Sequence, residues 1–302
     1  DQVNAVTAVM SGRDFQAFTT GTEFTVPQLD GEPLTPSSFL FKVSTRRGSA
    51  SGTRPQMTEG GSIYLQRGGK SLRELIFSDL EGSFVSNDIS MLSSHLLQNP
   101  TEIAMRRGSN VDEGDLLMIV NGGTGTLAGS IAAFSILRSQ NVIAPSLLTT
   151  EGTFEDIGIE DSDTPVMYVT VKRTINSATV YYLETFDNNY TTDAAVQYGA
   201  AAGPVLTGLA HLEAETVKVI ADDALLGDET VASSQITADR VTTTYAEVGL
   251  EFPTFTDELA DNATKTTPLI RTMPVETRLP SGPVTGFLKR IFCDPDRRTP
   301  CL

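Results

Sequence analysis

The sequence predicts a mainly β protein. Short apolar segments alternate with turns rich in Gly, Ser and Asn along most of the chain, a pattern typical of strands joined in hairpins. The many Thr, Ser and Gly residues also indicate β structure, and Trp is absent. Expected hairpin turns near Gly12, Gly68, Gly122 and Asn176 recur at roughly 50-residue intervals, within the range of propeller blades.

The clearest single element is a hairpin formed by Ser62–Gln66 and Leu72–Phe77. Its turn, Arg67-Gly68-Gly69-Lys70, places two Gly residues where a tight turn needs positive φ. After the hairpin, Asn87 is expected to cap a short helical turn. One face of that turn would carry Ile89, Leu92 and Leu96.

The remaining strands are predicted from the alternation of apolar and polar residues and from short apolar runs. They are Val3–Met10, Phe15–Thr19, Phe24–Val26, Phe39–Val43, Ile103–Arg106, Leu116–Val120, Ala132–Leu137, Val166–Lys172, Val180–Glu184, Thr216–Ile220, Glu229–Val231, Arg240–Val248, Leu269–Arg278 and Val284–Phe292. The polar segment Ser44–Met57 is predicted to be a mobile loop, either a solvated linker or a finger touching a neighbouring subunit. A small-residue joint at Tyr198–Pro204 divides the chain into a β domain, residues 1–202, and a compact β-rich module, residues 203–302.

Charge restricts the partners of the chain. The net charge of −16 argues against a general nucleic-acid-binding surface, because phosphate contacts need clustered Lys and Arg. It suits a conduit that DNA traverses without sticking, and it would equally keep an abundant protein in solution. No run reaches the ~18 consecutive apolar residues of a membrane helix, so no membrane insertion is expected.

Three groups of residues are candidates for chemistry. Leu116–Val120 and the glycine-rich segment Gly122–Gly129 resemble the start of a dinucleotide-binding βα unit, if Ile131–Leu137 is a helix. The Gly spacing is not the standard one and no β/α alternation follows, so a hairpin turn is the simpler interpretation. His95 and His211 could serve as imidazole bases, but both lie beside apolar residues and are interpreted as packing or interface residues.

The third group is an acidic cluster around Ile157-Gly158-Ile159. Carboxylates in this density can perform acid–base chemistry or bind Ca²⁺, yet the spacing matches no calcium loop, and a solvated turn is expected. The cluster consists of Glu155, Asp156, Glu160, Asp161 and Asp163. Cys293 and Cys301 are too few for a disulfide scaffold or a four-cysteine zinc site, and reduced thiols are expected, with a local disulfide as the alternative. No catalytic, cofactor-binding or metal-binding residue is therefore assigned.

Several short segments together resemble one family. They are Leu65–Glu74, Ser90–Leu97, Gly125-Thr126-Leu127-Ala128, Thr170-Val171-Lys172-Arg173-Thr174, Gly208-Leu209-Ala210-His211-Leu212-Glu213 and Glu247-Val248-Gly249-Leu250. In this order, the segments resemble the tail-tube nozzle proteins of short-tailed bacteriophages, also called tail tubular protein B or packaged-DNA stabilisation protein. The chain departs from the family pattern by starting inside a propeller-like strand, by ending before the expected C-terminal strands, and by carrying Ala144-Pro145-Ser146 where relatives have a Trp-bearing segment.

This resemblance implies a β-propeller-like body followed by a β-rich platform module. It implies a structural virion protein rather than an enzyme, assembled in the host cytoplasm into a sixfold ring in the virion tail. The ring would extend the DNA channel below a tail adaptor, retain packaged double-stranded DNA and permit its ejection, with no cofactor. Two alternatives stay open: a nucleotide-binding enzyme using Gly122–Gly129, and a β-rich carbohydrate-binding or hydrolase module with a carboxylate pair or aromatic platform.

Overall fold

The computed structural model describes residues 4–27, 35–36, 39–58, 60–108, 114–140, 142–160, 162, 165–187, 190–199, 203–241 and 244–251. Strands account for 56% of them and helix for 4%, so the fold is mainly β, as predicted. The described helices are the short 3-10 turns η1 (Ser94–Leu96), η2 (Arg138–Gln140) and η3 (Ala210–Leu212). None of these helices is long and apolar enough to cross a membrane.

Contacts within the chain divide it into two units. Unit 1 comprises residues 1–128 and 132–145, and unit 2 comprises residues 129–131 and 146–302. The expected domain boundary between residues 202 and 203 stays a prediction. Strand β16 (Asp193–Tyr198) pairs with β21 (Ala246–Leu250), so one sheet of unit 2 draws strands from both sides of the small-residue joint.

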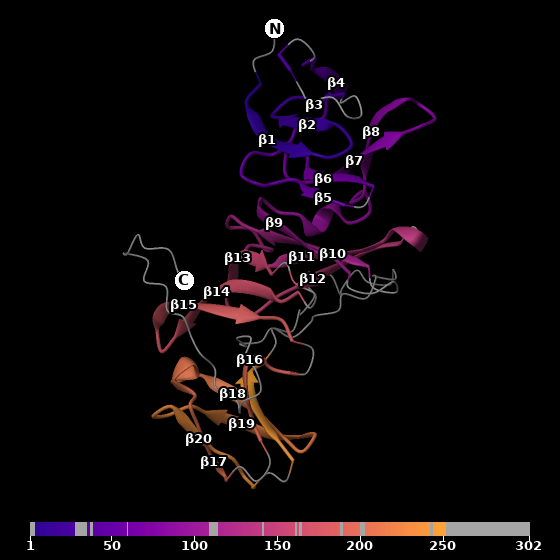
Figure 1. Cartoon of the computed structure of the whole chain (residues 1–302). Coiled ribbons are helices and arrows are strands. Elements are labelled where there is room, and N and C mark those ends of the chain that lie inside the picture. The colour runs from indigo at the N-terminus through magenta and orange to yellow at the C-terminus, as the bar shows by residue number, and fades with distance from the viewer. Residues whose placement is uncertain are drawn as a thin grey trace, which may run out of the picture. The chain divides into compact units, whose positions relative to one another are not determined.

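The first four sheets share one organisation, in which strands are hydrogen-bonded in chain order (Figure 1). Three of these sheets are four-stranded and one is three-stranded. The first holds β1 (Val6–Ser11), β2 (Phe15–Thr19), β3 (Glu23–Val26) and β4 (Lys42–Thr45). The second holds β5 (Gln56–Met57), β6 (Gly61–Leu65), β7 (Leu72–Ser78) and β8 (Ser83–Asp88). The third holds β9 (Pro100–Arg106), β10 (Asp115–Asn121), β11 (Ile131–Leu137) and β12 (Val142–Leu148), and the fourth holds β13 (Thr153–Ile159), β14 (Met167–Ile175) and β15 (Ala178–Thr185).

The last part of the described chain is organised differently. Its larger sheet has the order β16-β21-β18-β19, with β18 at Thr216–Ala221 and β19 at Ala224–Thr230. A two-stranded sheet pairs β17 (Val205–Thr207) with β20 (Gln235–Thr237). Among the described residues, no sheet closes into a barrel or propeller.

The hairpin that dominates the sequence is confirmed. Strands β6 and β7 pair antiparallel, with Leu65 opposite Leu72 next to the turn. Gly68 and Gly69 have φ values of 142° and 69°, a region in which a side chain would clash with its own backbone. Ile63, Tyr64 and Leu65 are buried, so this strand is inside unit 1 rather than on its surface.

The predicted helical turn after the hairpin is wrong. Residues 83–88 form β8, and Asn87 lies opposite Glu74 of β7 instead of capping a helix. The only helical part near this point is η1, whose cap residue Ser93 makes no side-chain cap bond, and Leu92 is exposed. The physical reason is tertiary: β7 offers an unpaired edge, and backbone pairing along that edge outweighs a weak local helix preference.

The polar segment Ser44–Met57 is not an unattached loop. Its first residues belong to β4 and its last two form β5. Between them, the Ala50 N–H donates to the Leu65 carbonyl and the Arg67 N–H donates to the Gly48 carbonyl. These bonds attach the segment to the hairpin. The two strands predicted near the C-terminus, as well as Cys293 and Cys301, lie outside the described residues.

Each unit contains a buried hydrophobic cluster of its own. In unit 1, the Phe18, Tyr64, Leu75 and Phe84 side chains form a buried cluster, with the Phe18 and Tyr64 ring centroids 5.2 Å apart. The core cluster of unit 2 contains aliphatic side chains, among them Leu206, Leu209, Leu212, Val217, Val219 and Val248.

Candidate functional site

The glycine-rich segment Gly122–Gly129 joins β10 to β11. Because β11 is a strand, no helix N-terminus follows the loop, and the premise of a nucleotide-binding βα unit fails. Two N–H groups of the loop are used by hydrogen bonds within the protein. The Leu127 N–H donates to Gln98 Oε1 at 2.7 Å, and the Gly122 N–H donates to the Asn99 carbonyl at 3.0 Å. A Cβ added at Gly125 would overlap the Gln98 side chain. The loop is therefore built as a turn, in agreement with the simpler interpretation of the sequence.

The acidic cluster lies on a strand rather than in a turn. Glu155 and Asp156 are exposed residues of β13, and Glu160 directly follows this strand. Asp161 and Asp163 lie outside the described residues. Among the residues that the structure describes, no three His, Cys, Asp or Glu side chains gather as metal ligands would.

The two His residues differ. His211 is 1% exposed, its Nε2 lies 3.1 Å from the Ala194 carbonyl oxygen, and its ring contacts the Tyr182 ring edge to face. The prediction of a packing residue is confirmed for His211. His95 is exposed on η1, so the packing interpretation is wrong for this residue, and the interface interpretation stays a prediction.

A buried ion network, formed by Arg173, Glu184 and Asp193, occupies the interior of unit 2. The three side chains come from β14, β15 and β16 and are at most 1% exposed. Arg173 Nε and Nη2 donate to the two Glu184 oxygens at 2.9 and 2.7 Å. Arg173 Nη2 and Nη1 donate to the two Asp193 oxygens at 2.8 and 3.0 Å, and Nη1 also donates to the Glu151 carbonyl. All five guanidinium N–H groups are therefore used.

The electrostatics of this network keep Arg173 charged. Burial alone would lower the pKa of Arg173, but the charges of Glu184 and Asp193 outweigh burial and raise that pKa. Asp193 Oδ2 also accepts from the Thr150 hydroxyl at 2.7 Å and from the Glu151 N–H at 2.9 Å. Arg173 has no donor left for a substrate, so the network connects two sheets and a loop rather than performing chemistry.

A second buried carboxylate binds the segment that leads into β16. Glu247 Oε1 on β21 accepts from the backbone N–H groups of Thr191 and Thr192 at 2.8 and 2.7 Å. It also accepts from both Thr hydroxyls. Glu247 is 2% exposed, so its charge is held by this set of donors. It fixes the segment that precedes β16.

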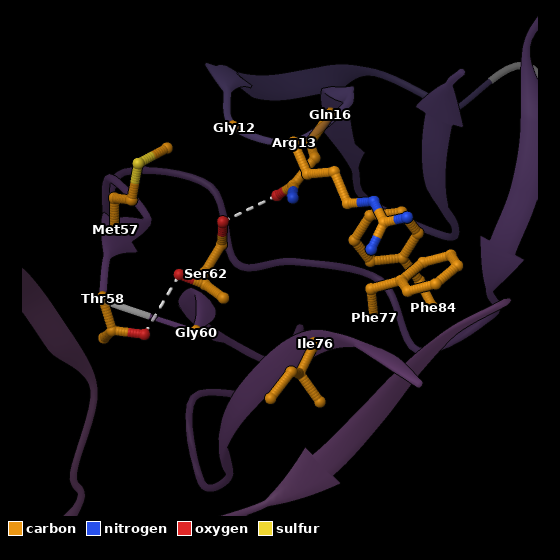
Figure 2. A pocket seen from close by; sticks show the side chains of 11 residues that line it. Gly12, Arg13, Gln16, Met57, Thr58, Gly60, Ser62, Ile76, Phe77 and Phe84 are labelled. Carbon is orange, nitrogen blue, oxygen red and sulfur yellow. Dashed lines mark hydrogen bonds between the residues drawn. The ribbon is translucent and has the colours of Figure 1, made fainter. Parts of the chain in front are cut away.

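A pocket of about 440 Å³ opens in unit 1 between the first two sheets (Figure 2). Its lining consists of a hairpin turn, three Gly residues without side chains, and a small apolar wall. The lining residues are Gly12, Arg13, Gln16, Met57, Thr58, Gly60, Gly61, Ser62, Ile76, Phe77 and Phe84. Because this volume lies in the range of small-ligand sites, the pocket is the candidate binding site of the described chain.

The polar groups of the pocket come from two strands and a turn. The Arg13 guanidinium carbon lies 4.0 Å from the centroid of the Phe77 ring. Gln16 is 3% exposed, and its Oε1 accepts from the Ser62 hydroxyl at 2.7 Å. The Thr58 hydroxyl donates to the Gly61 carbonyl and accepts from Arg138 Nη2. Figure 2 shows Arg13 along Phe77 and Phe84 on one side of the pocket, with Met57 and Thr58 on the other.

The sequence interpretation missed both the ion network and the pocket. One signal for the ion network was present: Arg173 continues the buried face of β14 that Val169 and Val171 begin, so strand alternation puts a cation inside. A buried cation needs a carboxylate partner, but the alternation does not say which one. The pocket had no such signal, because Arg13 and Met57 are widely separated in sequence and line the same pocket only when two sheets pack.

Comparisons with known proteins give no name to these sites. No protein-family model matches the chain, and no curated protein matches it.

Proposed function

We propose that the chain is a structural subunit of a short-tailed bacteriophage tail nozzle. In this role it forms a ring in the virion tail that extends the DNA channel, retains packaged DNA and permits its ejection. Catalysis is not part of the proposed role. The support comes from the ordered segments that resemble this family and from the positions that they occupy in the fold.

The observation that carries the proposal is the position of these segments. Leu65–Glu74 contains the turn and paired ends of the β6–β7 hairpin. Three of the later segments supply Arg173, His211 and Glu247, which are among the buried polar residues of unit 2. Several of the segments that resemble the family therefore carry buried contacts of the fold, which supports a shared structural scaffold.

The finer architecture that we propose is a propeller-like body. Its support is the chain-order pairing in the first four sheets, since the propeller blade is a four-stranded sheet of consecutive strands. Pro145, in the segment that departs from the family pattern, lies on the edge strand β12, the position in a sheet that tolerates Pro. The proposed β-rich platform module, residues 203–302, would include strands β18, β19 and β21 of the last four-stranded sheet.

Self-association tests the proposal directly. We expect a closed cyclic assembly of identical subunits, with six as the proposed number, either alone or with the tail adaptor. Mass photometry of the native tail complex, followed by two-dimensional class averages, measures both mass and symmetry. A strictly monomeric chain in the complete tail complex would contradict the nozzle function.

DNA handling gives a second test. We expect the wild-type ring to bind double-stranded DNA weakly, with an affinity that falls as salt rises, because any phosphate contacts release counterions. Replacing four of the five residues of the acidic cluster, by Asp156→Asn, Glu160→Gln, Asp161→Asn and Asp163→Asn, would slow DNA ejection if the cluster faces the channel. Unchanged ejection would place the cluster outside the channel, and tight, salt-resistant DNA binding by the wild-type ring would contradict a conduit.

A further inference from the structure

The pocket of unit 1 has a chemical preference that the nozzle proposal does not use. Among its described lining residues, Arg13 is the one ionisable side chain, and it is a cation in a chain of net charge −16. Its partner Asp79 lies outside the lining at 3.8 Å, and the two side chains are 64% and 92% exposed. An exposed pair at this distance is weak, so Arg13 keeps most of its capacity to bind an anion.

Gln16 supplies a second donor at the back of the pocket. Its Oε1 is committed to the Ser62 hydroxyl, which leaves the Nε2 amide group as the free end. Nε2 has no acceptor among the described residues, and it lies 3.6 Å from the position that a Cβ on Gly12 would occupy. Because Gln16 lines the pocket, a ligand acceptor that enters the pocket can take this amide N–H in place of water.

The remaining side-chain groups add apolar surface and steric room. Thr58 has already used its hydroxyl as donor and acceptor, and Arg138 behind it is paired with Glu74. The apolar walls are Met57, Ile76, Phe77 and Phe84. Gly12, Gly60 and Gly61 contribute no side chains, which leaves the space between the donors and the apolar wall open.

We propose that this pocket binds a carboxylate carried on a small apolar group. Arg13 binds one carboxylate oxygen from the solvent side and Gln16 Nε2 donates to the other from inside. The apolar part of the ligand packs against Ile76 and Phe84, because the Phe77 face is already covered by Arg13. A free organic acid and an acidic side chain beside an apolar residue of another polypeptide carry this same chemistry.

A matched pair of probes tests the charge requirement. We expect 3-phenylpropionate to bind the full-length protein in ligand-observed NMR titrations, and 3-phenylpropionamide, which has the same shape without the charge, to bind at least tenfold more weakly. Arg13→Gln should weaken binding of the acid about tenfold, since it removes a charge-assisted contact at a partly screened site. Equal binding of acid and amide would overturn the proposal.

Two variants separate the pocket from nonspecific charge effects. Gly12→Leu should abolish binding, because the Cβ has ordinary contact distances to Met57 and Gln16 and the rest of the side chain would fill the pocket. Lys70→Gln removes the same charge as Arg13→Gln from an exposed turn and should leave the affinity unchanged. Thermal melting of each variant verifies its fold. Binding that survives Gly12→Leu in a folded protein would exclude this pocket as the site.

The two sources of the carboxylate are distinguished by peptide probes. If the natural ligand is a polypeptide, N-acetyl-Phe-Glu-amide should bind more tightly than 3-phenylpropionate, and N-acetyl-Phe-Gln-amide should bind more weakly than its Glu counterpart. Tighter binding of the free acid than of either peptide would identify a small organic acid. These titrations are independent of ring formation, so their outcome is separate from that of the nozzle proposal.

Discussion

The aromatic cluster of unit 1 and the ion network of unit 2 are built from different chemistry. The buried cluster of unit 1 contains three aromatic rings, and the polar Tyr64 hydroxyl within it is satisfied by Ser86 at 2.9 Å. Unit 2 contains an aliphatic cluster and, in addition, a buried ion network centred on Arg173. A ring packs with neighbours from many directions, whereas a guanidinium needs its carboxylates in fixed places. We infer that the ion network is specified by polar geometry and the aromatic cluster by shape.

The two units also differ in charge. Unit 1 has 11 Lys and Arg against 14 Asp and Glu, a net charge of −3, whereas unit 2 has 11 against 24, a net charge of −13. The acidity of the chain therefore belongs almost entirely to unit 2. In the proposed nozzle, unit 2 is the part expected to repel DNA, and unit 1 is the part free to bind an anion.

The largest effect is expected in the ion network. Arg173→Met would leave Glu184 and Asp193 buried without a cation, so we expect a loss of about 3–5 kcal/mol in the free energy of unfolding. Chemical denaturation measures this loss. Adding Glu184→Met should recover part of it by removing one uncompensated charge, whereas a double variant less stable than the single one would contradict the electrostatic explanation. Lys218→Met breaks two surface ion pairs and serves as the control with a small effect.

A cavity in unit 1 should cost nearly as much. Phe18→Ala removes a fully buried ring from the aromatic cluster, and we expect a loss of about 3–5 kcal/mol. Leu80→Ala changes a fully exposed side chain and should alter stability by less than about 0.5 kcal/mol. Hydrogen exchange would show which amides lose protection. If Phe18→Ala and Arg173→Met each weaken amide protection equally in both units, the two units unfold together. The aromatic cluster and the ion network would then not stabilise their units separately.

Alkaline pH should weaken unit 1 through Tyr64. Burial raises the pKa of Tyr64 to about 12, above the ordinary value of 10 in the unfolded chain. The neutral phenol therefore stabilises the fold fully below pH 10, and this stabilisation falls by about 2 kcal/mol as the pH rises from 10 to 12. Urea unfolding between these pH values measures the slope. Tyr64→Phe should reduce the slope of the unfolding free energy against pH. Any pH dependence that remains in this variant would come from other groups such as Tyr198, whose pKa is also raised by burial.

The smallest effect is expected at the hairpin turn. Gly68→Val and Gly69→Val each force a β-branched residue into positive φ, which should lower stability by about 1–2 kcal/mol. Gly158→Val on β13 is the matched control, because its φ is ordinary and a Cβ there contacts nothing. Thermal melting of the three variants is sufficient. Equal melting temperatures would remove the turn from the list of features that specify unit 1.

Much of the local structure follows from the sequence. The segment Phe15–Thr19 is a strand with the predicted bounds, and the Gly68-Gly69 and Asn176 turns lie where apolar runs are interrupted. Strands form here because alternating side chains have one face to bury, and turns form because Gly and Asn tolerate positive φ. Both causes act within a few residues, so the local sequence is sufficient to predict these strands and turns.

Other features were decided only by tertiary structure. Asn87 has the residue type of a helix cap, yet it became part of a strand because β7 presented backbone groups to pair. Arg173 is recognisably inward-facing on β14, but its partners Glu184 and Asp193 are selected by the way β15 and β16 approach it. The pocket of Arg13 and Gln16 likewise exists only between two packed sheets. Backbone pairing and charge compensation join residues distant in sequence, and their free energy depends on distances that local patterns do not contain.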